Sequence, residues 1–373
     1  MNNKKYLKVY INDKLVGVLA ETKKHLVAFE YSEDWLANGF SISPFSLPLR
    51  KEVFVPKKYD PFEGLFGVFA DSLPDGWGRL LVDRLLLKNG INPASVNALT
   101  RLAIVGNSGM GALEYRPSEE LQHGLEDLSL DELAWECRQI FDKEHSEHLD
   151  ELFRLGGSSG GARPKVNYEL EGEEWIVKFP SSIDGTDIGR QEYDYSVCAK
   201  KCGLTMTDTR LMISKYCGGY FATKRFDRNG SQKIHMVSVS GLLETSHRIP
   251  NLDYNILMQL TLQLTHSYEE VEKMFRLMCF NVYSHNRDDH SKNFSYLWQE
   301  GEWKLSPVYD LTYSNSIGGE HATCVNGNGS NPGMKDMLEV AKNAKLDVKK
   351  AKLIAEEIRE IVSSGLREYL KIR

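Results

Sequence analysis

The first part of the chain alternates apolar and polar residues, the pattern of strands with one buried face. LKVYINDKLVGVLAET (residues 7–22) alternates on both sides of an Asn-Asp pair that is typical of a tight turn, and so predicts a β-hairpin. HLVAFEYSEDWL (residues 25–36) continues the pattern. We therefore expect residues 1–60 to form a small antiparallel sheet.

A helical period follows. In GWGRLLVDRLLLKN (residues 76–89) the leucines recur at helical spacing with arginines opposite, and SVNALTRLAIVG predicts a second helix that ends at Gly106. A soft acidic linker then leads into an amphipathic helix, in which Ser129 and Glu132 resemble a capping box. We place a domain boundary near Pro117–Asp131.

The remainder of the chain mixes both patterns. A Gly/Ser-rich loop (residues 155–164) precedes the strand EEWIVKFP, the helix RQEYDYSVCAKKCGL and two β segments around TDTRLMISKYC and YFATKRFDRNG. A long helical region is expected from Asp253 to about Tyr283, and one terminal helix over residues 337–365. The expected class is α+β.

Length and charge narrow the picture. A chain of 373 residues exceeds one hydrophobic core, so we expect three parts, residues 1–120, 121–240 and 241–373. The net charge of −6 argues against sequence-independent binding to nucleic acid. The start has no apolar stretch typical of a secretory signal, and no segment approaches the length of a membrane span. A cytoplasmic protein without a membrane partner is expected.

Three features occur in the order that a kinase requires. The first is the Gly-rich loop, where Gly156, Gly157, Gly160 and Gly161 bracket Ser158 and Ser159. Such a backbone turns freely and presents N–H groups to an anion. The pattern is neither a Walker A motif nor GxGxxG, and an ordinary turn is the alternative.

The second feature is Lys178, in the strand WIVKFP. A lysine among apolar residues either reaches solvent or meets an anion, such as a nucleotide phosphate. The alternative is an edge strand with one wet face. Glu192, on the following helix, is a potential charge partner.

The third feature is NRDDHSKNFS (residues 286–295), which resembles a kinase catalytic loop. Asp288 would orient the acceptor hydroxyl and Asn293 would bind Mg²⁺. A hairpin then returns the chain to Asp310, whose apolar neighbours indicate a carboxylate that is paired or bound to metal. Asp310 is therefore the second expected Mg²⁺ ligand, and a solvated loop is the alternative.

Together these motifs resemble the HipA family, the serine/threonine kinase toxins of bacterial HipBA toxin–antitoxin modules. The likeness runs through FGVFADSLPDGWGRLL, IVGNSGMGALEY, GGSSGGARPK, WIVKFP, ATKRFDR, RDDHSKNFS and SPVYDLT. It implies a bilobal, protein-kinase-like α+β fold with an N-terminal β-rich subdomain, a nucleotide-binding lobe and a mostly helical C-terminal lobe. ATP and Mg²⁺ are the implied cofactors.

The resemblance also implies roles for single residues. Asp288 would be catalytic, Asn293 and Asp310 would hold Mg²⁺, and Lys178 would contact the ATP phosphates. The Gly-loop residues Gly157 to Gly161 would cover the phosphates, Lys224 and Phe226 would present backbone groups to adenine, and His290 would contact the nucleotide or position its loop. Ser158 or Ser159 would be autophosphorylated, which places negative charge on the loop and repels ATP.

The family implies partners as well: a HipB-like helix-turn-helix antitoxin, operator DNA reached mainly through it, and a protein substrate such as an aminoacyl-tRNA synthetase. The chain departs from the best-known pattern at Asp289, where glycine is usual, which suggests a more acidic acceptor pocket. Two alternatives remain open, a kinase of a small molecule or lipid head group, and a silent scaffold. Intact Asp288, Asn293, Asp310 and Lys178 argue against the scaffold.

Overall fold

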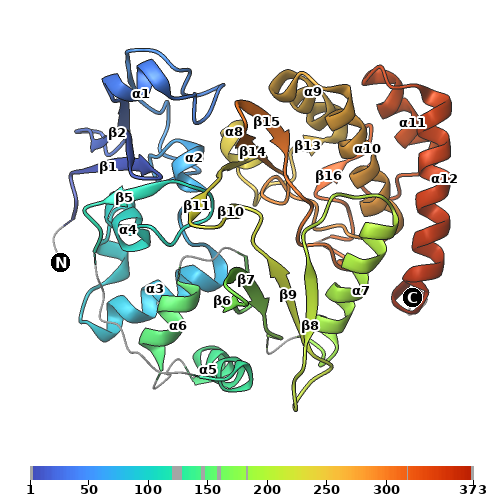
Figure 1. The fold of residues 1–373 in the computed structure, drawn as a ribbon, viewed down its shortest axis with the longest axis horizontal. Helices are drawn as coiled ribbons and strands as arrows, with labels where there is room; N and C mark the ends of the chain where they lie inside the picture. Colours follow the sequence, from blue (N-terminus) through green and yellow to red (C-terminus); the bar gives the residue numbers. More distant parts are fainter. Residues whose placement is uncertain are drawn as a thin grey trace. The chain divides into compact units, whose positions relative to one another are not determined.

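The computed structural model describes residues 3–119, 128–143, 148–157, 161–181, 184–316 and 318–370, and Figure 1 shows the order of its helices and strands. The chain divides into two units. The first comprises Met1–Gly189 and Leu211–Thr245, and the second comprises Arg190–Arg210 and Ser246–Arg373. Neither unit is one continuous segment, because the chain leaves the first unit, returns to it and leaves it again.

The first unit begins with the expected antiparallel sheet. Its strand order is β4-β3-β2-β1-β5, and Asn12 and Asp13 close the first hairpin with φ angles of 45° and 64°. These left-handed angles suit Asn and Asp, which tolerate them better than most residues do. The strands are β1 (Tyr6–Ile11), β2 (Lys14–Glu21), β3 (Val27–Tyr31), β4 (Val53–Phe54) and β5 (Glu114–Arg116).

The described part of this unit also contains short and longer helices. The two helices expected before residue 106 are confirmed: α3 begins after Asp75, and α4 ends at Gly106, whose φ of 58° stops the helix. The helical elements of this unit are α1 (Glu33–Asn38), α2 (Gly67–Ala70), α3 (Gly76–Lys88), η1 (Pro93–Ser95), α4 (Ala98–Val105), α5 (Leu130–Lys143), α6 (Leu149–Gly156) and α8 (Val239–Leu242).

A second antiparallel sheet in this unit carries the expected nucleotide-binding strands. β7 (Glu173–Lys178) lies between β6 (Lys165–Leu170) and β9 (Tyr220–Lys224). Lys178 therefore lies on an inner strand, and the alternative of an edge strand is wrong. Short strands follow: β10 (Arg228–Asn229), β11 (Gln232–Lys233) and β12 (His235–Ser238). β8 (Thr209–Met212) begins in the second unit and ends in the first.

One hydrophobic core joins α3, α5 and α6 to this sheet. Trp77 and Leu81 from α3 pack with Trp175 and Val177 from β7, although about one hundred residues separate them along the chain. The core consists of Trp77, Leu81, Leu133, Cys137, Ile140, Leu149, Leu152, Val166, Trp175, Val177, Phe179, Tyr220 and Ala222. The N-terminal segment and the nucleotide-binding sheet are thus packed as one body.

The second unit is mostly helical. α10 packs against both α9 and α12 around fully buried Phe275, Phe280 and Ile358. Its elements are α7 (Ile188–Lys201), which starts at the end of the first unit, β13 (Leu252–Asp253), α9 (Tyr254–Thr265), α10 (Tyr268–Tyr283), β14 (Ser295–Gln299), β15 (Glu302–Leu305), β16 (Thr323–Cys324), α11 (Met334–Asn343), α12 (Val348–Gly365) and α13 (Arg367–Leu370).

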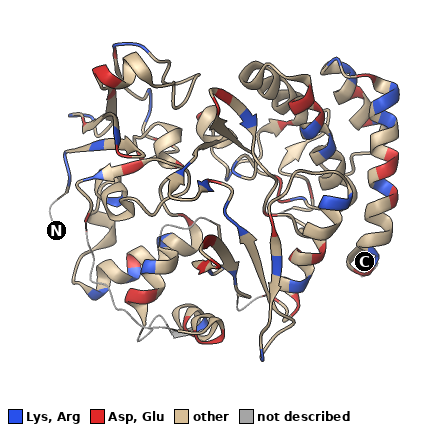
Figure 2. Ribbon diagram, viewed as in Figure 1, with Lys and Arg blue, Asp and Glu red and all other residues tan. Residues whose placement is uncertain are grey.

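The helical region expected from Asp253 to about Tyr283 is present as two helices, α9 and α10. His266 in a left-handed conformation and the capping Ser267 separate α9 from α10. The expected single terminal helix is wrong. Lys345 has a φ of 59°, and the Asp347 carboxylate begins a new helix, α12, by accepting hydrogen bonds from the Lys349 and Lys350 N–H groups. Figure 2 shows charges of both signs along α12, the solvated face that its sequence predicts.

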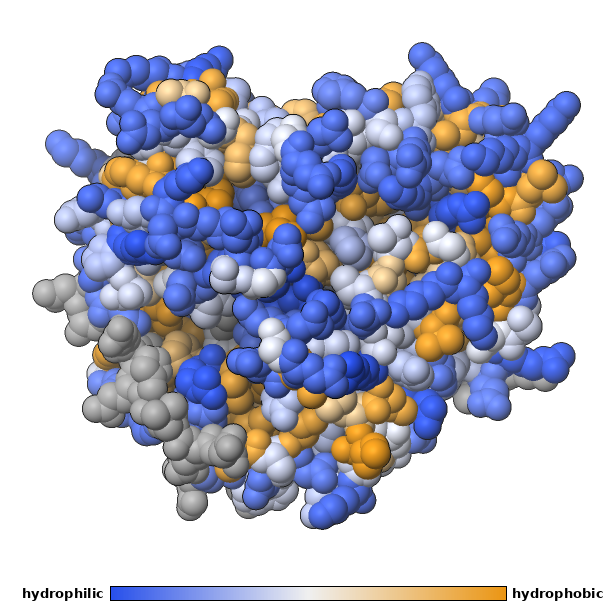
Figure 3. All heavy atoms as spheres, in the orientation of Figure 1, coloured by the Kyte–Doolittle hydropathy of each residue, from blue (hydrophilic) through white to orange (hydrophobic). Residues whose placement is uncertain are grey.

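In the part of the chain that the structure describes, every helix is too short or too polar to cross a bilayer. On the face drawn in Figure 3, apolar residues form separate patches among hydrophilic ones.

Candidate active site

Two buried lysines face each other in the second sheet of the first unit. Lys165, the first residue of β6, is in register with Lys178, the last residue of β7, and their exposed fractions are 8% and 9%. Opposed residues of antiparallel strands have side chains on the same face. The Lys178 ammonium lies 5.5 Å from the Phe221 ring centroid. Two lysines on one face of the sheet are the kind of arrangement that can hold an anion.

The Gly-rich loop ends beside these lysines. Ser158, Ser159 and Gly160 lie outside the described residues, whereas Gly157 and Gly161 are described. Gly161 has a φ of 82°, and a Cβ built on it would lie 2.7 Å from the Lys165 ammonium. The far end of the loop is therefore next to the cation that begins β6.

The KRFDR segment forms a buried ion network at the end of β9. Arg225 and Asp227 pair at 2.8 Å, with exposed side-chain fractions of 3% each, and Arg225 also donates to the Gly109 carbonyl. Burial opposes ionisation of Asp227, but the Arg225 charge holds the pKa of its carboxyl below the usual value. The Gly111 N–H donates to the same carboxylate. This network fixes the backbone around Lys224 and Phe226, the expected adenine contacts, and joins it to the GNSGMG segment.

Asp288 and Asn293 lie on one tight loop in the second unit. The Asn293 amide nitrogen donates to the Asp288 carbonyl at 2.7 Å, and the Asn293 N–H donates to the His290 carbonyl at 2.8 Å. The Asp288 side chain is 59% exposed, and its carboxylate lies 3.9 Å from His290 Nε2. His290 Nδ1 accepts from the Lys292 N–H. His290 thus holds the loop in shape, and the Asp288 carboxylate reaches solvent.

The segment that carries Asp310 runs along this loop. β14 and β15 form the expected hairpin, closed by Glu300 and Gly301, which both have positive φ. The hydroxyl of Tyr309, the residue before Asp310, donates to the Lys292 carbonyl, next to Asn293, at 2.6 Å. Further on, the Ser314 N–H donates to the His285 carbonyl. These bonds bring the segments of Asp288, Asn293 and Asp310 together.

Asp310 has a φ of 54°, which is rare for a residue with a side chain. Such strain persists only where the surrounding structure imposes it, and it is frequent at functional sites. The neighbours Val308 and Leu311 are buried, whereas Asp310 is half-buried. The backbone therefore turns this one carboxylate out of an apolar segment.

Asp289 does not make the acceptor pocket more acidic, contrary to the interpretation from its position in the sequence. Its side chain is fully buried and accepts hydrogen bonds from the Tyr254 hydroxyl, His321 Nδ1 and the Thr323 N–H, at 3.0, 3.0 and 3.2 Å. Burial, and then the Asp289 charge, raises the pKa of Tyr254, so its hydroxyl remains a donor. Asp289 anchors the catalytic loop from the inside.

The chemistry of these donors fits Mg²⁺. Because the Asn293 amide nitrogen donates to the Asp288 carbonyl, the amide oxygen is the atom of this side chain that could bind a metal ion. Asp310 would supply a carboxylate from the adjoining segment. Magnesium prefers few protein oxygens and takes the rest of its octahedron from phosphates and water. The described residues contain no group of three or more His, Cys, Asp and Glu side chains that could hold a metal ion.

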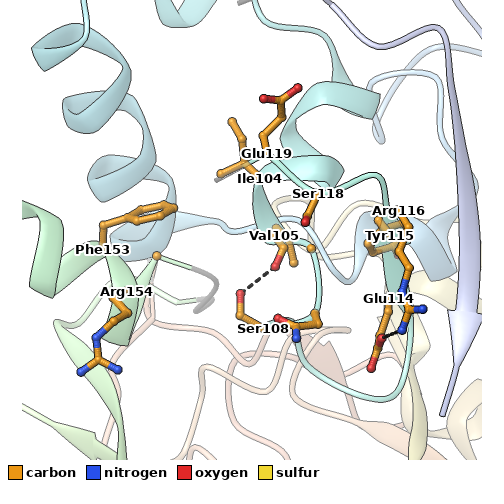
Figure 4. Close-up of a pocket in the computed structure, with 13 residues that line it drawn as sticks. Ile104, Val105, Ser108, Glu114, Tyr115, Arg116, Ser118, Glu119, Phe153 and Arg154 are labelled. Carbon is orange, nitrogen blue, oxygen red and sulfur yellow. Dashed lines mark hydrogen bonds and ion pairs between the residues drawn. The ribbon is translucent and has the colours of Figure 1, made fainter. Parts of the chain in front are cut away.

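A cavity of about 370 Å³ lies elsewhere in the first unit, between the end of α4, β5 and the end of α6 (Figure 4). The Ser108 hydroxyl donates to the Val105 carbonyl at its wall, and Arg116 pairs with Glu114. Neither Lys165 nor Lys178 lines this cavity. Its charged residues are paired with each other or with neighbours, so we do not assign the phosphate site to it.

Sequence reasoning missed Lys165, Arg225 and Asp227. Each is a charged residue that the structure buries, and each stands in a motif that was quoted for other residues. The signal for Lys165 was its position at the start of a strand directly after the Gly-rich loop. Glu192 is fully buried but belongs to the second unit, so its pairing with Lys178 stays a prediction.

Comparison with known proteins places these features in a family. The HipA N-terminal domain model matches residues 7–116, and the HipA-like C-terminal domain model matches residues 157–365. A Sinorhizobium fredii protein, Y4mE, named as a candidate kinase, is 26% identical over 340 residues, which is 82% of this chain and 76% of that protein.

A solved structure shares the fold. HipA of Shewanella oneidensis MR-1, solved in complex with HipB and its operator DNA, superposes with a TM-score of 0.73 at 18% identity, over 98% of this chain and 90% of that one. At this identity the likeness establishes the α+β, kinase-like fold. With both family models covering most of the sequence, the chain belongs to the HipA family of kinase-like toxins.

Proposed function

We propose that the protein is an ATP- and Mg²⁺-dependent serine/threonine protein kinase that inhibits growth. The observation that carries the proposal is the buried pair Lys165 and Lys178. Two lysines on one face of a sheet, one of them beside the Gly-rich loop, suit a polyphosphate better than a singly charged ligand.

The catalytic loop supplies the groups for transfer to a hydroxyl. The exposed Asp288 carboxylate would accept the proton of the attacking serine or threonine hydroxyl. Asn293 and Asp310 would hold Mg²⁺, which when bound supplies neutralisation of the charge on the transferred group. His290 would keep Asp288 and Asn293 in position, as its bonds within the loop suggest.

Three further groups would complete the nucleotide site. Lys224 and Phe226 would present backbone groups to adenine, supported by the ion network that fixes their segment. The loop residues Gly157, Ser158, Ser159, Gly160 and Gly161 would cover the phosphates. Glu192 would pair with Lys178.

Regulation and partners belong to the proposal too. Autophosphorylation of Ser158 or Ser159 would place two negative charges on the phosphate loop and weaken ATP binding. Support for a HipB-like antitoxin, and for contact with operator DNA mainly through it, comes from the complex in which the Shewanella HipA was solved. A component of translation, such as an aminoacyl-tRNA synthetase, would be the cytoplasmic substrate.

The test is to incubate the purified protein with Mg²⁺, γ-labelled ATP and a bacterial lysate, with an Asp288→Asn chain in parallel. We expect label on serine or threonine of a lysate protein and on the kinase itself, and none with Asp288→Asn. Label that enters only metabolites or lipids would contradict a protein kinase and favour the alternative of a small-molecule or lipid-head-group kinase.

A further inference from the structure

A turn in the N-terminal segment, Pro74–Trp77, holds the far end of the Gly-rich loop. The Trp77 N–H donates to the Gly161 carbonyl at 2.9 Å, and the Gly161 N–H donates to the Asp75 carboxylate. Both backbone groups of Gly161 are therefore bound by one turn that lies 86 positions earlier in the sequence. A bond from an N–H to a carboxylate is among the stronger hydrogen bonds in proteins.

The Trp77 ring reaches the strand that follows the loop. Its indole N–H donates to the Lys165 carbonyl at 3.1 Å. The near end of the loop packs at the same place, because a Cβ on Gly156 would lie 2.6 Å from the Lys165 carbonyl oxygen and 3.1 Å from the indole nitrogen. Both ends of the loop thus meet at Trp77.

The close approach depends on Gly76. Its φ is 45°, and a Cβ built there would lie 2.3 Å from the Gly161 carbonyl oxygen. Only glycine tolerates both this backbone angle and this contact. The turn and the loop end can therefore approach this closely because each has a glycine at the contact, Gly76 and Gly161.

The turn itself is rigidly supported. Trp77 is 1% exposed, its ring stacks on Phe141 at 5.3 Å, and it packs in the core that includes Trp175 of β7. Asp75 is the residue before α3, and its carboxylate accepts the Gly161 N–H without capping the helix. A Gly-rich loop loses much conformational entropy when it is ordered. Anchors on a buried tryptophan reduce that loss before any ligand binds.

We propose that Asp75 and Trp77 are positioning residues for nucleotide binding. They fix Gly161 and the start of β6, and with them the Lys165 ammonium that lies beside Gly161. This rests on the proposed function, and it gives the N-terminal segment a direct part in the phosphate site. An Asp75→Ala change would free the loop end without removing any group that touches the phosphates.

The experiment compares three variants with the wild-type chain. Asp75→Ala removes the acceptor, Asp75→Asn keeps an oxygen acceptor of the same size, and Trp77→Phe keeps the ring but loses the indole N–H. The matched control is Asp83→Ala, on the same helix, which loses an ion pair with Arg101 away from the loop. A fluorescent ATP analogue with Mg²⁺ reports binding, and amide hydrogen exchange of residues 156–165 reports the loop.

We expect Asp75→Ala to weaken analogue binding about tenfold and to speed exchange in the loop peptide, as the loss of a charge-assisted hydrogen bond predicts. Asp75→Asn should restore most of the analogue binding and most of the protection from exchange. Trp77→Phe should give values between those of wild type and Asp75→Ala, and Asp83→Ala should bind the analogue as wild type does. Unchanged binding and exchange in a folded Asp75→Ala chain would overturn the proposal, and so would an equal loss in Asp83→Ala.

The two proposals fail in different ways. A wild-type chain that does not bind the analogue refutes the kinase function, whereas the exchange experiment still shows whether Asp75 holds the loop. A wild-type chain that binds, with Asp75→Ala binding equally well, refutes only the positioning role.

Discussion

Lys165 and Lys178 lie directly opposite each other on β6 and β7, and both are more than nine-tenths buried. Sheets normally avoid like charges at opposed positions because the repulsion is not screened by water. A sheet with lysines at both of these positions is suited to a ligand with several negative charges.

The first prediction concerns this pair. Lys165→Met keeps the apolar stem but removes the charge, so stabilisation of the protein by Mg²⁺ and an ATP analogue should largely disappear, with Kd raised tenfold or more. Thermal unfolding with and without the analogue measures this. Lys304→Met, an exposed ion-pair partner on β15, is the control and should keep the full shift. An equal ligand-induced shift in both variants would refute the role of Lys165.

Asp288 should be needed for chemistry and dispensable for folding. Its side chain is 59% exposed, and its carboxylate lies 3.9 Å from His290 Nε2. Asp288→Asn should therefore lower the rate of phosphoryl transfer by about 10² to 10⁴ with an unchanged melting temperature and unchanged analogue binding. Glu302→Gln, an exposed acid on β15, should retain full activity. A rate within threefold of wild type for Asp288→Asn would exclude it as the catalytic base.

Its neighbour Asp289 should behave in the opposite way. Asp289→Ala leaves the buried Tyr254 hydroxyl, His321 and the Thr323 N–H without their common acceptor. The expected loss is about 3 kcal/mol in the free energy of unfolding, measured by urea denaturation. Activity should fall with the folded fraction. A loss below about 1 kcal/mol would show that the network does not anchor the loop.

Glu244 should make the protein less stable as pH rises. Burial raises the pKa of its carboxyl to about 7, although the Gly67 N–H donates to it. Between pH 4.5 and 7 the folded chain therefore holds more protons than the unfolded chain, so the free energy of unfolding falls across this window. Glu244→Gln should flatten the profile there. A wild-type profile that rises through this window, with no change in Glu244→Gln, would contradict the assignment.

His235 should act in the other direction. Burial lowers the pKa of its ring to about 4, with Nε2 donating to the Ile42 carbonyl at 2.8 Å. As pH falls below 6.5, His235 binds a proton in the unfolded chain before it does so in the folded chain. This residue therefore lowers the free energy of unfolding progressively down to pH 4. His235→Gln keeps a donor and should remove the loss. Measuring denaturation midpoints at pH 4, 5 and 6.5 in both variants separates it from Glu244.

Local structure was largely predictable. The N-terminal hairpin, α3 and α4 followed from periodicity and from Asn12, Asp13 and Gly106. The break at His266 was not, because the apolar spacing continues through it. Asp347 is a residue type that often begins a helix, but the continuous pattern of charges on both sides of it predicted one uninterrupted helix. The division of the chain near residues 120 and 240 stays a prediction.

The candidate site was predictable where chain order carries the information. Asp288, Asn293 and Asp310 follow from the spacing of one loop and one hairpin, and their chemical roles remain predictions. The position of Lys165 opposite Lys178 depends on the strand register, which the sequence alone does not give. A slip of one residue would turn the Lys165 side chain to the other face of the sheet. The anchoring role of Asp289 depends on Tyr254 and Thr323, more than thirty residues away in opposite directions, so no local pattern reveals it.

The core that Trp77 shares with Trp175 limits how the gene for this chain can be divided. The two segments that the family models match separately, residues 7–116 and 157–365, share this core, so we expect neither to fold well as an independent piece. A transcript that encodes only the later segment would yield a sheet stripped of its covering helix, exposing tryptophan and valine to chaperones and proteases. Recombination within such genes should therefore preserve the pairing of both segments, and a truncated chain should be degraded rapidly.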